Sequence, residues 1–186
     1  NGNQVEGDFA SVIGGWNNRS RGNFAVVVGG GGGSVADSNI ASGNYSFIGN
    51  GFRNVASGAA SVIAGGYVNE ANGSGSIVSG GANNALGYGS TIGGGGQNRA
   101  RGLFSVIAGG GGQIVFDSNS TVGAYSAIGG GIRNDAVGIF SVVGGGYGNS
   151  ASDTASVVSG GEGNSALGKY ATVSGGDSNT VTGSHA

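Results

Sequence analysis

The chain has 186 residues, 47 of them glycine, and contains no proline, cysteine or methionine. Seven basic and nine acidic residues give a formal net charge of −2, which favours neither a nucleic-acid partner nor an anionic membrane surface. Glycine without proline excludes collagen, and the lack of cysteine excludes disulfides and thiolate metal sites. The apolar runs are too short to span a bilayer, so we expect no membrane contact by this segment. Since the sequence starts at Asn1 without methionine, we expect it to be a fragment of a longer protein.

Periodic glycine distinguishes this chain from a disordered, low-complexity segment. Eleven segments can be superimposed, with spacings of 15, 21, 15, 15, 14, 15, 21, 15, 15 and 15 residues. From its first to its fifteenth position the unit reads aromatic or small, Ser/Ala, Val, Ile/Val, small, Gly, Gly, two variable residues, Asn, x, Ala, x, Gly, x. The units begin at Phe9, Phe24, Tyr45, Ala60, Gly75, Gly89, Phe104, Tyr125, Phe140, Ala155 and Tyr170.

A longer period of 80 residues lies above the short repeat. The sequence RSRG at 19–22 returns as RARG at 99–102, and the 21-residue unit occurs once in each block. No linker interrupts the units. We therefore predict one continuous repeat domain over residues 1–186, with a tandem cassette at 9–88 and 89–169.

The unit is too short for a pair of helices, and glycine costs a helix about 0.8–1 kcal/mol per site. Its Ser-Val-Ile segment is β-rich and bounded by Gly and Asn turns. A strand, a turn, a second short strand and another turn make one coil of a solenoid in which neighbouring coils pair in parallel. The sequence predicts an all-β, single-domain parallel β-solenoid (β-roll) of about 11 coils of 14–21 residues, which we expect to be trimeric.

Alternation along a strand assigns the near-constant positions to the interior. The fourth position is β-branched in every unit, from Val12 to Val173. The recurrent Asn is expected to form a hydrogen-bonded ladder at a corner, where Asn tolerates a positive φ. The predicted ladder consists of Asn18, Asn39, Asn54, Asn69, Asn84, Asn98, Asn119, Asn134, Asn149, Asn164 and Asn179.

The outward positions form an apolar stripe, which a soluble monomer rarely exposes over a large area. We therefore expect an obligate homo-oligomer that buries this stripe against further copies of the chain. The predicted stripe consists of Phe24, Val26, Tyr45, Phe47, Val62, Ile77, Phe104, Val106, Tyr125, Phe140, Val142 and Val157.

The sequence lacks the residues that a catalytic triad or a metal site requires. The sole histidine is His185, and the nine acidic residues form no close pair at corresponding positions. The glycine runs at 29–33 and 93–96 lack the Gly-Lys-Ser/Thr of a phosphate loop, so they are interpreted as coil corners. Asp37 and Asp117 each precede Ser-Asn, and one Asp per loop favours turn capping over calcium. We expect no enzyme activity, no cofactor and no metal.

Two groups of residues are candidates for a ligand surface. Four aromatic residues share the corner after the Gly pair, where they stack on sugars, anchor a partner, or merely cover neighbouring coils or a chain interface. The six extra residues of each long unit, around 31–37 and 111–117, are expected to bulge as binding loops or to cap a chain interface. The candidates are Trp16, Ser34, Val35, Asp37, Phe52, Tyr67, Gln113, Ile114, Phe116, Asp117 and Tyr147.

Three segments resemble the head repeats of YadA-type trimeric autotransporter adhesins: FSVIAGGGGQ at 104–113, YSAIGGGIRNDAVG at 125–138 and FSVVGGGYGNSASD at 140–153. The resemblance implies a left-handed parallel β-roll that forms a homotrimer. It also implies a bacterial cell-surface adhesin, anchored in the outer membrane by a region outside this sequence. Its partners would be host extracellular-matrix proteins, cell-surface glycans or other bacteria.

Two alternatives remain open from the sequence. The same style of repeat occurs in phage fibres, which would make the chain a receptor-binding segment of a virion tail. A weaker alternative is an ice-binding solenoid, for which Thr91 and Thr172 are too isolated to form a regular array.

Overall fold

Each repeat folds into two strands of two residues joined by turns, and neighbouring repeats pair in parallel. The computed structural model describes residues 2–186, where two 3-10 helices are the only helices. The prediction of an all-β parallel β-solenoid is confirmed. By internal contacts the chain divides into two units, Asn1–Gly89 and Ser90–Ala186.

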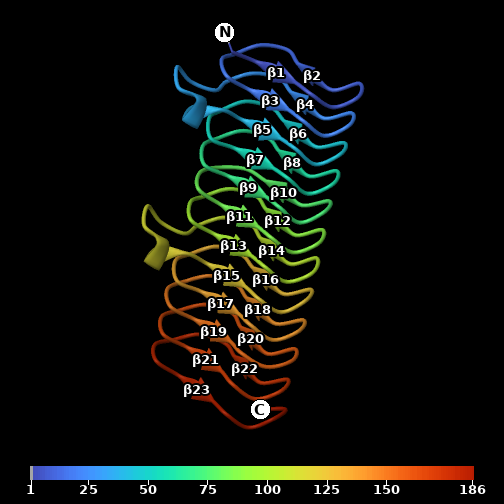
Figure 1. Ribbon diagram of the computed structural model, residues 1–186. Helices are drawn as coiled ribbons and strands as arrows, with labels where there is room; N and C mark the ends of the chain where they lie inside the picture. Colours follow the sequence, from blue (N-terminus) through green and yellow to red (C-terminus); the bar gives the residue numbers. More distant parts are fainter. Residues whose placement is uncertain (1) are drawn as a thin grey trace. The chain divides into compact units, whose positions relative to one another are not determined.

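In the first unit, blue to green in Figure 1, strands of equal position lie above one another in two parallel sheets. Phe47 pairs with Val62 and Ile48 with Ile63, so equal positions of neighbouring coils are in register. The odd-numbered strands are β1 (Gln4–Val5), β3 (Arg19–Ser20), β5 (Ile40–Ala41), β7 (Val55–Ala56), β9 (Glu70–Ala71) and β11 (Asn84–Ala85). The even-numbered strands are β2 (Ser11–Val12), β4 (Val26–Val27), β6 (Phe47–Ile48), β8 (Val62–Ile63) and β10 (Ile77–Val78), and the helix is η1 (Val35–Asp37).

The second unit repeats this arrangement, with Val142 paired to Val157 and Val143 to Val158. Its first sheet consists of β12 (Thr91–Ile92), β14 (Val106–Ile107), β16 (Ala127–Ile128), β18 (Val142–Val143), β20 (Val157–Val158) and β22 (Thr172–Val173). Its second sheet consists of β13 (Arg99–Ala100), β15 (Ser120–Thr121), β17 (Asp135–Ala136), β19 (Ser150–Ala151), β21 (Ser165–Ala166) and β23 (Thr180–Val181), and its helix is η2 (Val115–Asp117).

The core of each unit is a narrow column of stacked small and β-branched side chains. At the fourth position Ile48 and Ile63 are fully buried, as are Ala56 and Ala71 at the twelfth. Val62, next to Ile63, points outward and is only half-buried. The burial therefore agrees with strand alternation. A core this thin has little room for larger side chains, which explains the Ser and Ala at the second and twelfth positions.

Glycine is required where one coil crosses close to the next. Gly30 has φ +77°, and a Cβ placed there would lie 2.0 Å from the carbonyl oxygen of Gly51. Gly43 has an ordinary φ, but its Cβ would lie 2.1 Å from the carbonyl oxygen of Gly58. Any side chain at these corners would push neighbouring coils apart and break their hydrogen bonds.

The ladder asparagines do not use the positive φ that Asn tolerates. The positive φ falls instead on the residue before the ladder Asn, as at Arg53 (+56°) and Val68 (+55°). It also falls on the first position of every unit, including Tyr45 (+61°) and Phe140 (+59°). The first-position residue therefore lies in a turn before the strand, which strand alternation alone does not predict.

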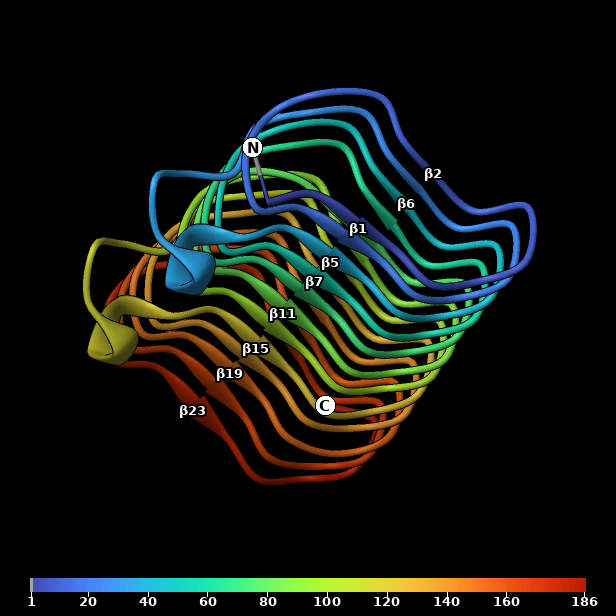
Figure 2. The same cartoon turned by 45° about the horizontal axis from the view of Figure 1, so that its top comes forward.

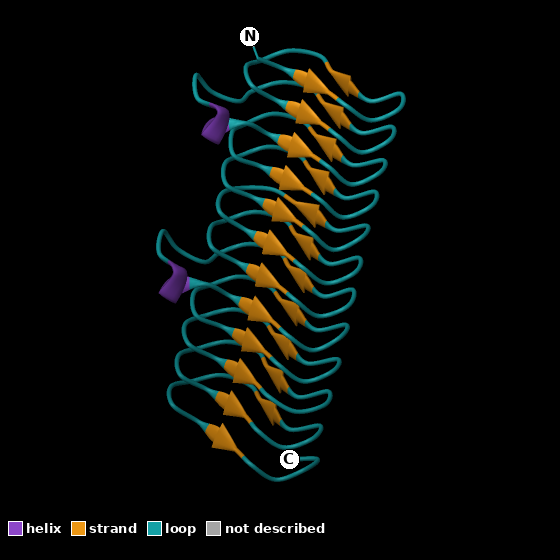
Figure 3. Cartoon of the chain, in the orientation of Figure 1, coloured by secondary structure: helices purple, strands orange, loops and turns teal. Residues whose placement is uncertain are grey.

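The two 21-residue units project a loop away from their coils, blue and olive in Figure 2. Each loop ends in its 3-10 helix, η1 or η2, shown in purple in Figure 3. After the helix the strands resume in register, since Ile40 pairs with Arg19 and with Val55. The inserts therefore leave the solenoid unperturbed.

Candidate functional site

The outer side of the even-numbered strands is apolar. At the third position Phe47, Ile77 and Val106 are exposed, with 37%, 44% and 41% of their surface accessible. At the fifth position, directly after the strands, Ile13 and Val28 are also exposed. We call the outward residues at the first, third and fifth positions of the repeats the apolar face.

No residue of the apolar face is charged, although Lys169 Nζ lies 5.0 Å from the ring centroid of Tyr170 at its edge. None of the seven basic and nine acidic residues of the sequence occupies any of the first five positions of a unit. The charges lie instead on the odd-numbered strands, at corners, in turns and in the inserts; Arg19, Glu70 and Asp135 are examples on the strands. An outer side free of charge next to one that is charged is the distribution expected of a surface that contacts another apolar surface.

Aromatic rings stack along the first position. In the first unit Phe24 lies between Phe9 and Tyr45, with ring centroids 5.1 and 5.0 Å apart. In the second unit Tyr125 lies between Phe104 and Phe140, at 5.6 and 5.2 Å. The rings of each stack are within 14° of parallel.

These stacked aromatics combine exposure with an unfavourable backbone. Phe24 has φ +59° and Tyr125 φ +59°, a conformation that costs a bulky residue on the order of 1 kcal/mol or more. Stacking returns about 0.5–1.5 kcal/mol per pair. Both rings nevertheless remain about half accessible to solvent. The same positive φ occurs at Ala60 and Ala155, so it is a property of the repeat turn, and the exposure of the rings is what distinguishes the aromatic positions.

All residues predicted for the stripe point outward in their own coils. Ala60 and Gly75 interrupt the aromatic stack of the first unit, and Ala155 interrupts that of the second. The exposed members are Phe24, Tyr45, Phe47, Ile77, Phe104, Val106, Tyr125, Phe140 and Val142, and the half-buried ones are Val26, Val62 and Val157.

The structure places the recurrent asparagines inside the corner before the odd-numbered strands. Asn54 Nδ2 donates to Asn39 Oδ1 at 3.0 Å and to the Gly66 carbonyl at 2.9 Å, while Asn54 Oδ1 accepts the Asn69 backbone N–H at 3.0 Å. The Asn54 oxygen therefore pairs a backbone N–H that the turn leaves without a carbonyl partner, while the Gly66 carbonyl also accepts the Phe52 N–H. The same position is occupied by Asn18, Asn39, Asn54, Asn69, Asn98, Asn119, Asn134, Asn149, Asn164 and Asn179.

The assignment of Asn84 to this ladder is wrong, because Asn83 occupies the position. Asn83 is buried, and its backbone N–H donates to Asn69 Oδ1 at 3.1 Å. Asn84 points outward and donates to Glu70 Oε2 at 2.8 Å. The 14-residue unit lacks one residue before its Asn. The spacing to the buried Ala indicates the correct residue, since Ala85 follows Asn83 by two positions as Ala71 follows Asn69.

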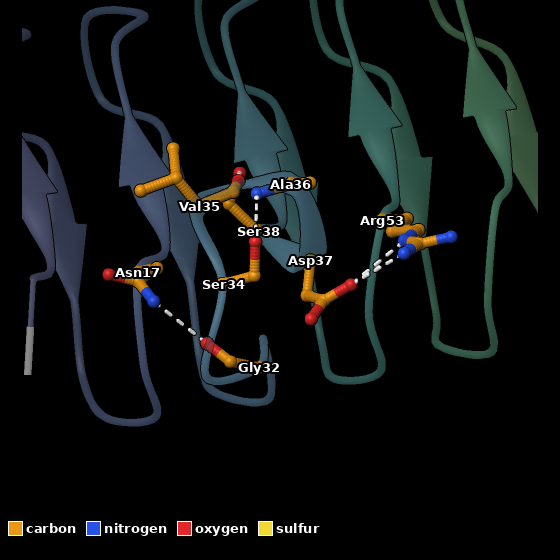
Figure 4. Close-up of polar contacts among 8 residues, drawn as sticks. All are labelled: Asn17, Gly32, Ser34, Val35, Ala36, Asp37, Ser38 and Arg53. Carbon is orange, nitrogen blue, oxygen red and sulfur yellow. Dashed lines mark hydrogen bonds and ion pairs between the residues drawn. The ribbon is translucent and has the colours of Figure 1, made fainter.

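An ion pair fixes the first insert to the following coil (Figure 4). Arg53 lies 2.8 Å from Asp37 Oδ1. Asn17 Nδ2 donates to the Gly32 carbonyl at 2.8 Å, and Ser34 Oγ accepts the Ala36 N–H at 3.2 Å at the start of η1. The loop is therefore anchored at its start, at its helix and at its end, while Val35 remains exposed.

The second insert has the same anchor and a more apolar tip. Arg133 lies 3.1 Å from Asp117 Oδ1, and its Nε donates to the Phe116 carbonyl at 3.1 Å. The tip residues Ile114 and Phe116 are exposed, Phe116 to 82%. Gln113, also predicted for this surface, lies in the same loop and is exposed.

The corner aromatics lie beside these ion pairs. The Arg133 guanidinium is 5.3 Å from the ring centroid of Tyr147 and donates to its hydroxyl. Arg53 is 6.0 Å from the ring centroid of Phe52, which stacks on Tyr67 at 5.8 Å. Trp16 forms an isolated bridge to Gly31 at the start of the first insert and is exposed.

The two arginines that connect insert and corner were not among the predicted site residues. The signal was present, because Asp and Arg recur 16 residues apart in both cassettes.

Among residues 2–186, no group of three or more His, Asp or Glu side chains could hold a metal ion. No helix in this part of the chain is long and apolar enough to cross a membrane. Desolvation raises the pKa of Asp135 above its ordinary value, against the opposing effect of the positive charge of Arg101. Comparison with known proteins gives no match, either to a family model or to a curated protein.

Proposed function

We propose that this chain is a non-enzymatic segment of a homotrimeric fibre or adhesin head on a bacterial surface. The observation that carries the proposal is the apolar face, which has no charged residue and carries exposed aromatic stacks. An apolar surface of this kind gains free energy when it is removed from water, at roughly 25 cal/mol per Å² of apolar area. Copies of the same chain are the partner that presents a matching face at the same coil spacing.

A trimer rather than a dimer is supported by the resemblance of residues 104–113, 125–138 and 140–153 to YadA-type head repeats. The inserts support the adhesive role, because they place apolar tips on a rigid scaffold, where binding residues commonly lie. Phe116 and Val35 project from loops whose ends are held by ion pairs. Matrix proteins or cell-surface glycans are the proposed ligands.

The assembly is tested by light scattering on the purified chain and on three aspartate variants. Val62→Asp, on the apolar face, should give folded monomers. Val55→Asp, on the outer side of the odd-numbered strand β7, should remain trimeric and is the matched control. Ile63→Asp buries an unpaired charge and should prevent folding. A folded, monomeric wild-type chain would refute the proposed assembly.

The adhesive role is tested separately by binding of the trimer to immobilised matrix proteins and glycans. Phe116→Ser should reduce binding without changing the oligomeric state, since Phe116 is 82% exposed and lies outside the core. If the double variant Phe116→Ser, Val35→Ser bound as well as the wild type, the inserts would not be part of the ligand surface. A membrane-anchor sequence beyond this segment favours the bacterial adhesin, whereas a virion-attachment domain favours the phage fibre.

A further inference from the structure

Asn50 interrupts a column of glycines. Every other unit has glycine at the sixth position, and the counterpart of Asn50 in the second cassette is Gly130. Asn50 is exposed, and the next residue is Gly51. The repeat itself therefore does not require an amide side chain at this corner.

The geometry at Asn50 brings its side-chain carbonyl against the next backbone nitrogen. The Gly51 N–H donates to Asn50 Oδ1 at 2.6 Å. No backbone carbonyl within residues 2–186 accepts this N–H. Gly51 has φ +108° and no Cβ, so the amide nitrogen is not shielded by a side chain. The nucleophile and the electrophilic carbonyl of a succinimide-forming reaction are thus already adjacent.

We propose that Asn50 is a site of spontaneous deamidation. The Gly51 amide loses its proton to water or hydroxide, and its nitrogen attacks Asn50 Cγ. The new N–C bond closes a five-membered succinimide as the side-chain nitrogen leaves, protonated, as ammonia. Water then adds to one of the two imide carbonyls and opens the ring to aspartate or to isoaspartate, with no change of oxidation state.

A second Asn-Gly pair, in the next repeat of the same half of the chain, provides an internal comparison. Asn72 is exposed like Asn50, but the Gly73 N–H donates to the Ala85 carbonyl at 3.0 Å. Asn72 Oδ1 accepts from Ser57 Oγ at 2.6 Å. Attack at Asn72 therefore requires breaking a hydrogen bond between neighbouring coils first. The pair at Asn1 begins outside the described residues.

The two products differ in their effect on the coil. Aspartate at position 50 keeps the backbone and adds one negative charge. Isoaspartate inserts a methylene into the main chain between β6 and β7, whose residues are held in register with β8 and β9. It also displaces the Asn50 carbonyl that accepts from Asn54 Nδ2 at 3.3 Å. Isoaspartate should therefore loosen this coil, whereas aspartate should not.

The proposal is tested by incubating the folded chain in mildly alkaline buffer and quantifying isoaspartate and aspartate at each Asn-Gly pair by peptide mass spectrometry. Conversion at Asn50 should exceed that at Asn72 by about tenfold or more, because the free energy of opening protects Asn72. In urea the two sites should convert at similar rates. Equal rates in the folded chain, or no conversion at Asn50, would overturn the proposal.

Asn50→Gly is the control variant, since glycine stands at this position in the other units. It should fold normally, lose the conversion at position 50 and leave the rate at Asn72 unchanged. Asn50→Asp should match the aged wild type in charge but not in thermal stability, because it lacks the lengthened backbone. An aged wild-type chain as stable as Asn50→Asp, with isoaspartate present, would show that this corner absorbs the extra methylene.

Discussion

Asn54 donates its side-chain amide to Asn39 Oδ1 at 3.0 Å, one coil earlier in the chain. Both side chains are fully buried. The same amide also satisfies the Gly66 carbonyl, and its oxygen accepts the Asn69 N–H. One side chain thus joins three successive coils at the corner where glycine interrupts the strands.

Asn54→Ala should therefore be among the most destabilising changes in the first unit. It leaves the buried Asn69 N–H unpaired, at about 1–3 kcal/mol for an unsatisfied group, and removes one of two hydrogen bonds of the Gly66 carbonyl, which still accepts the Phe52 N–H. The loss of unfolding free energy is measured by urea titration. Asn72→Ala, at an exposed asparagine, should cost about 1 kcal/mol or less. Similar losses for the two variants would show that the ladder does not stabilise the fold.

The shortened unit gives a second test of the same ladder. Asn83→Ala should destabilise the chain by about 2 kcal/mol, because Asn83 is buried and donates to the Ser79 carbonyl at 2.8 Å. Asn84→Ala removes an outward hydrogen bond to Glu70 and should cost about 1 kcal/mol or less. Thermal unfolding of the two variants side by side checks the order. A larger loss of stability for Asn84→Ala than for Asn83→Ala would show that Asn84 is the ladder residue.

The period of the sequence predicts the fold because one unit encodes one coil. The β-branched column that contains Ile48 and Ile63 is readable from the fourth position alone. The ladder is readable except at the 14-residue unit, where a one-residue deletion leaves two adjacent asparagines and the count from the unit start selects Asn84 over Asn83.

Features that depend on contacts between different coils are harder to predict from the sequence. The positive φ of Tyr45 depends on a turn in which the Ser46 N–H donates to the Gly43 carbonyl. The pairing of Asp37 with Arg53 depends on where the insert folds back, which no local propensity specifies. The outward orientation of the apolar face follows from strand alternation. The sequence of one repeat does not specify which surface covers that face.

Some of the second-position serines bury a hydroxyl group at a cost that alanine would remove. Ser61 and Ser76 are fully buried, and their hydroxyl oxygens have no hydrogen-bond partner within residues 2–186. Ala25 and Ala171 occupy the same position in other units and are equally buried. Ser61→Ala should therefore be neutral or should raise the unfolding free energy by up to about 1 kcal/mol. Ser156→Ala is the control.

Ser156 Oγ donates to the Asp153 carbonyl at 2.7 Å, so its replacement should instead lower stability. Calorimetry of both variants distinguishes the two cases. A clear loss for Ser61→Ala would indicate a hydrogen bond that the hydroxyl makes by rotation, as Ser126 Oγ does to the Gly123 carbonyl at 2.7 Å.

Removing the ion pair should free an insert without unfolding the solenoid. Asp117→Asn weakens the contact to Arg133, and a partly exposed pair contributes about 1 kcal/mol or less to stability. Hydrogen exchange should therefore increase for residues 112–118 and remain unchanged in β15 and β17. Ser120 pairs directly with Asp135, and no residue of the insert belongs to either strand. Increased exchange in those strands would show that the insert supports the coil.

Asp135 should make stability depend weakly on pH. Burial raises its folded-state pKa above the ordinary value of 3.8, so the folded chain binds this proton more tightly than the unfolded chain. Stability associated with Asp135 is therefore present at low pH and is lost as pH rises from about its ordinary value through the raised one. Asp135→Asn removes the charge and should be more stable than wild type at neutral pH, with a small difference because the side chain is partly exposed. The difference, measured by urea titration along a pH series, should vanish in acid; a variant less stable than wild type at neutral pH would show that the attraction to Arg101 outweighs the desolvation.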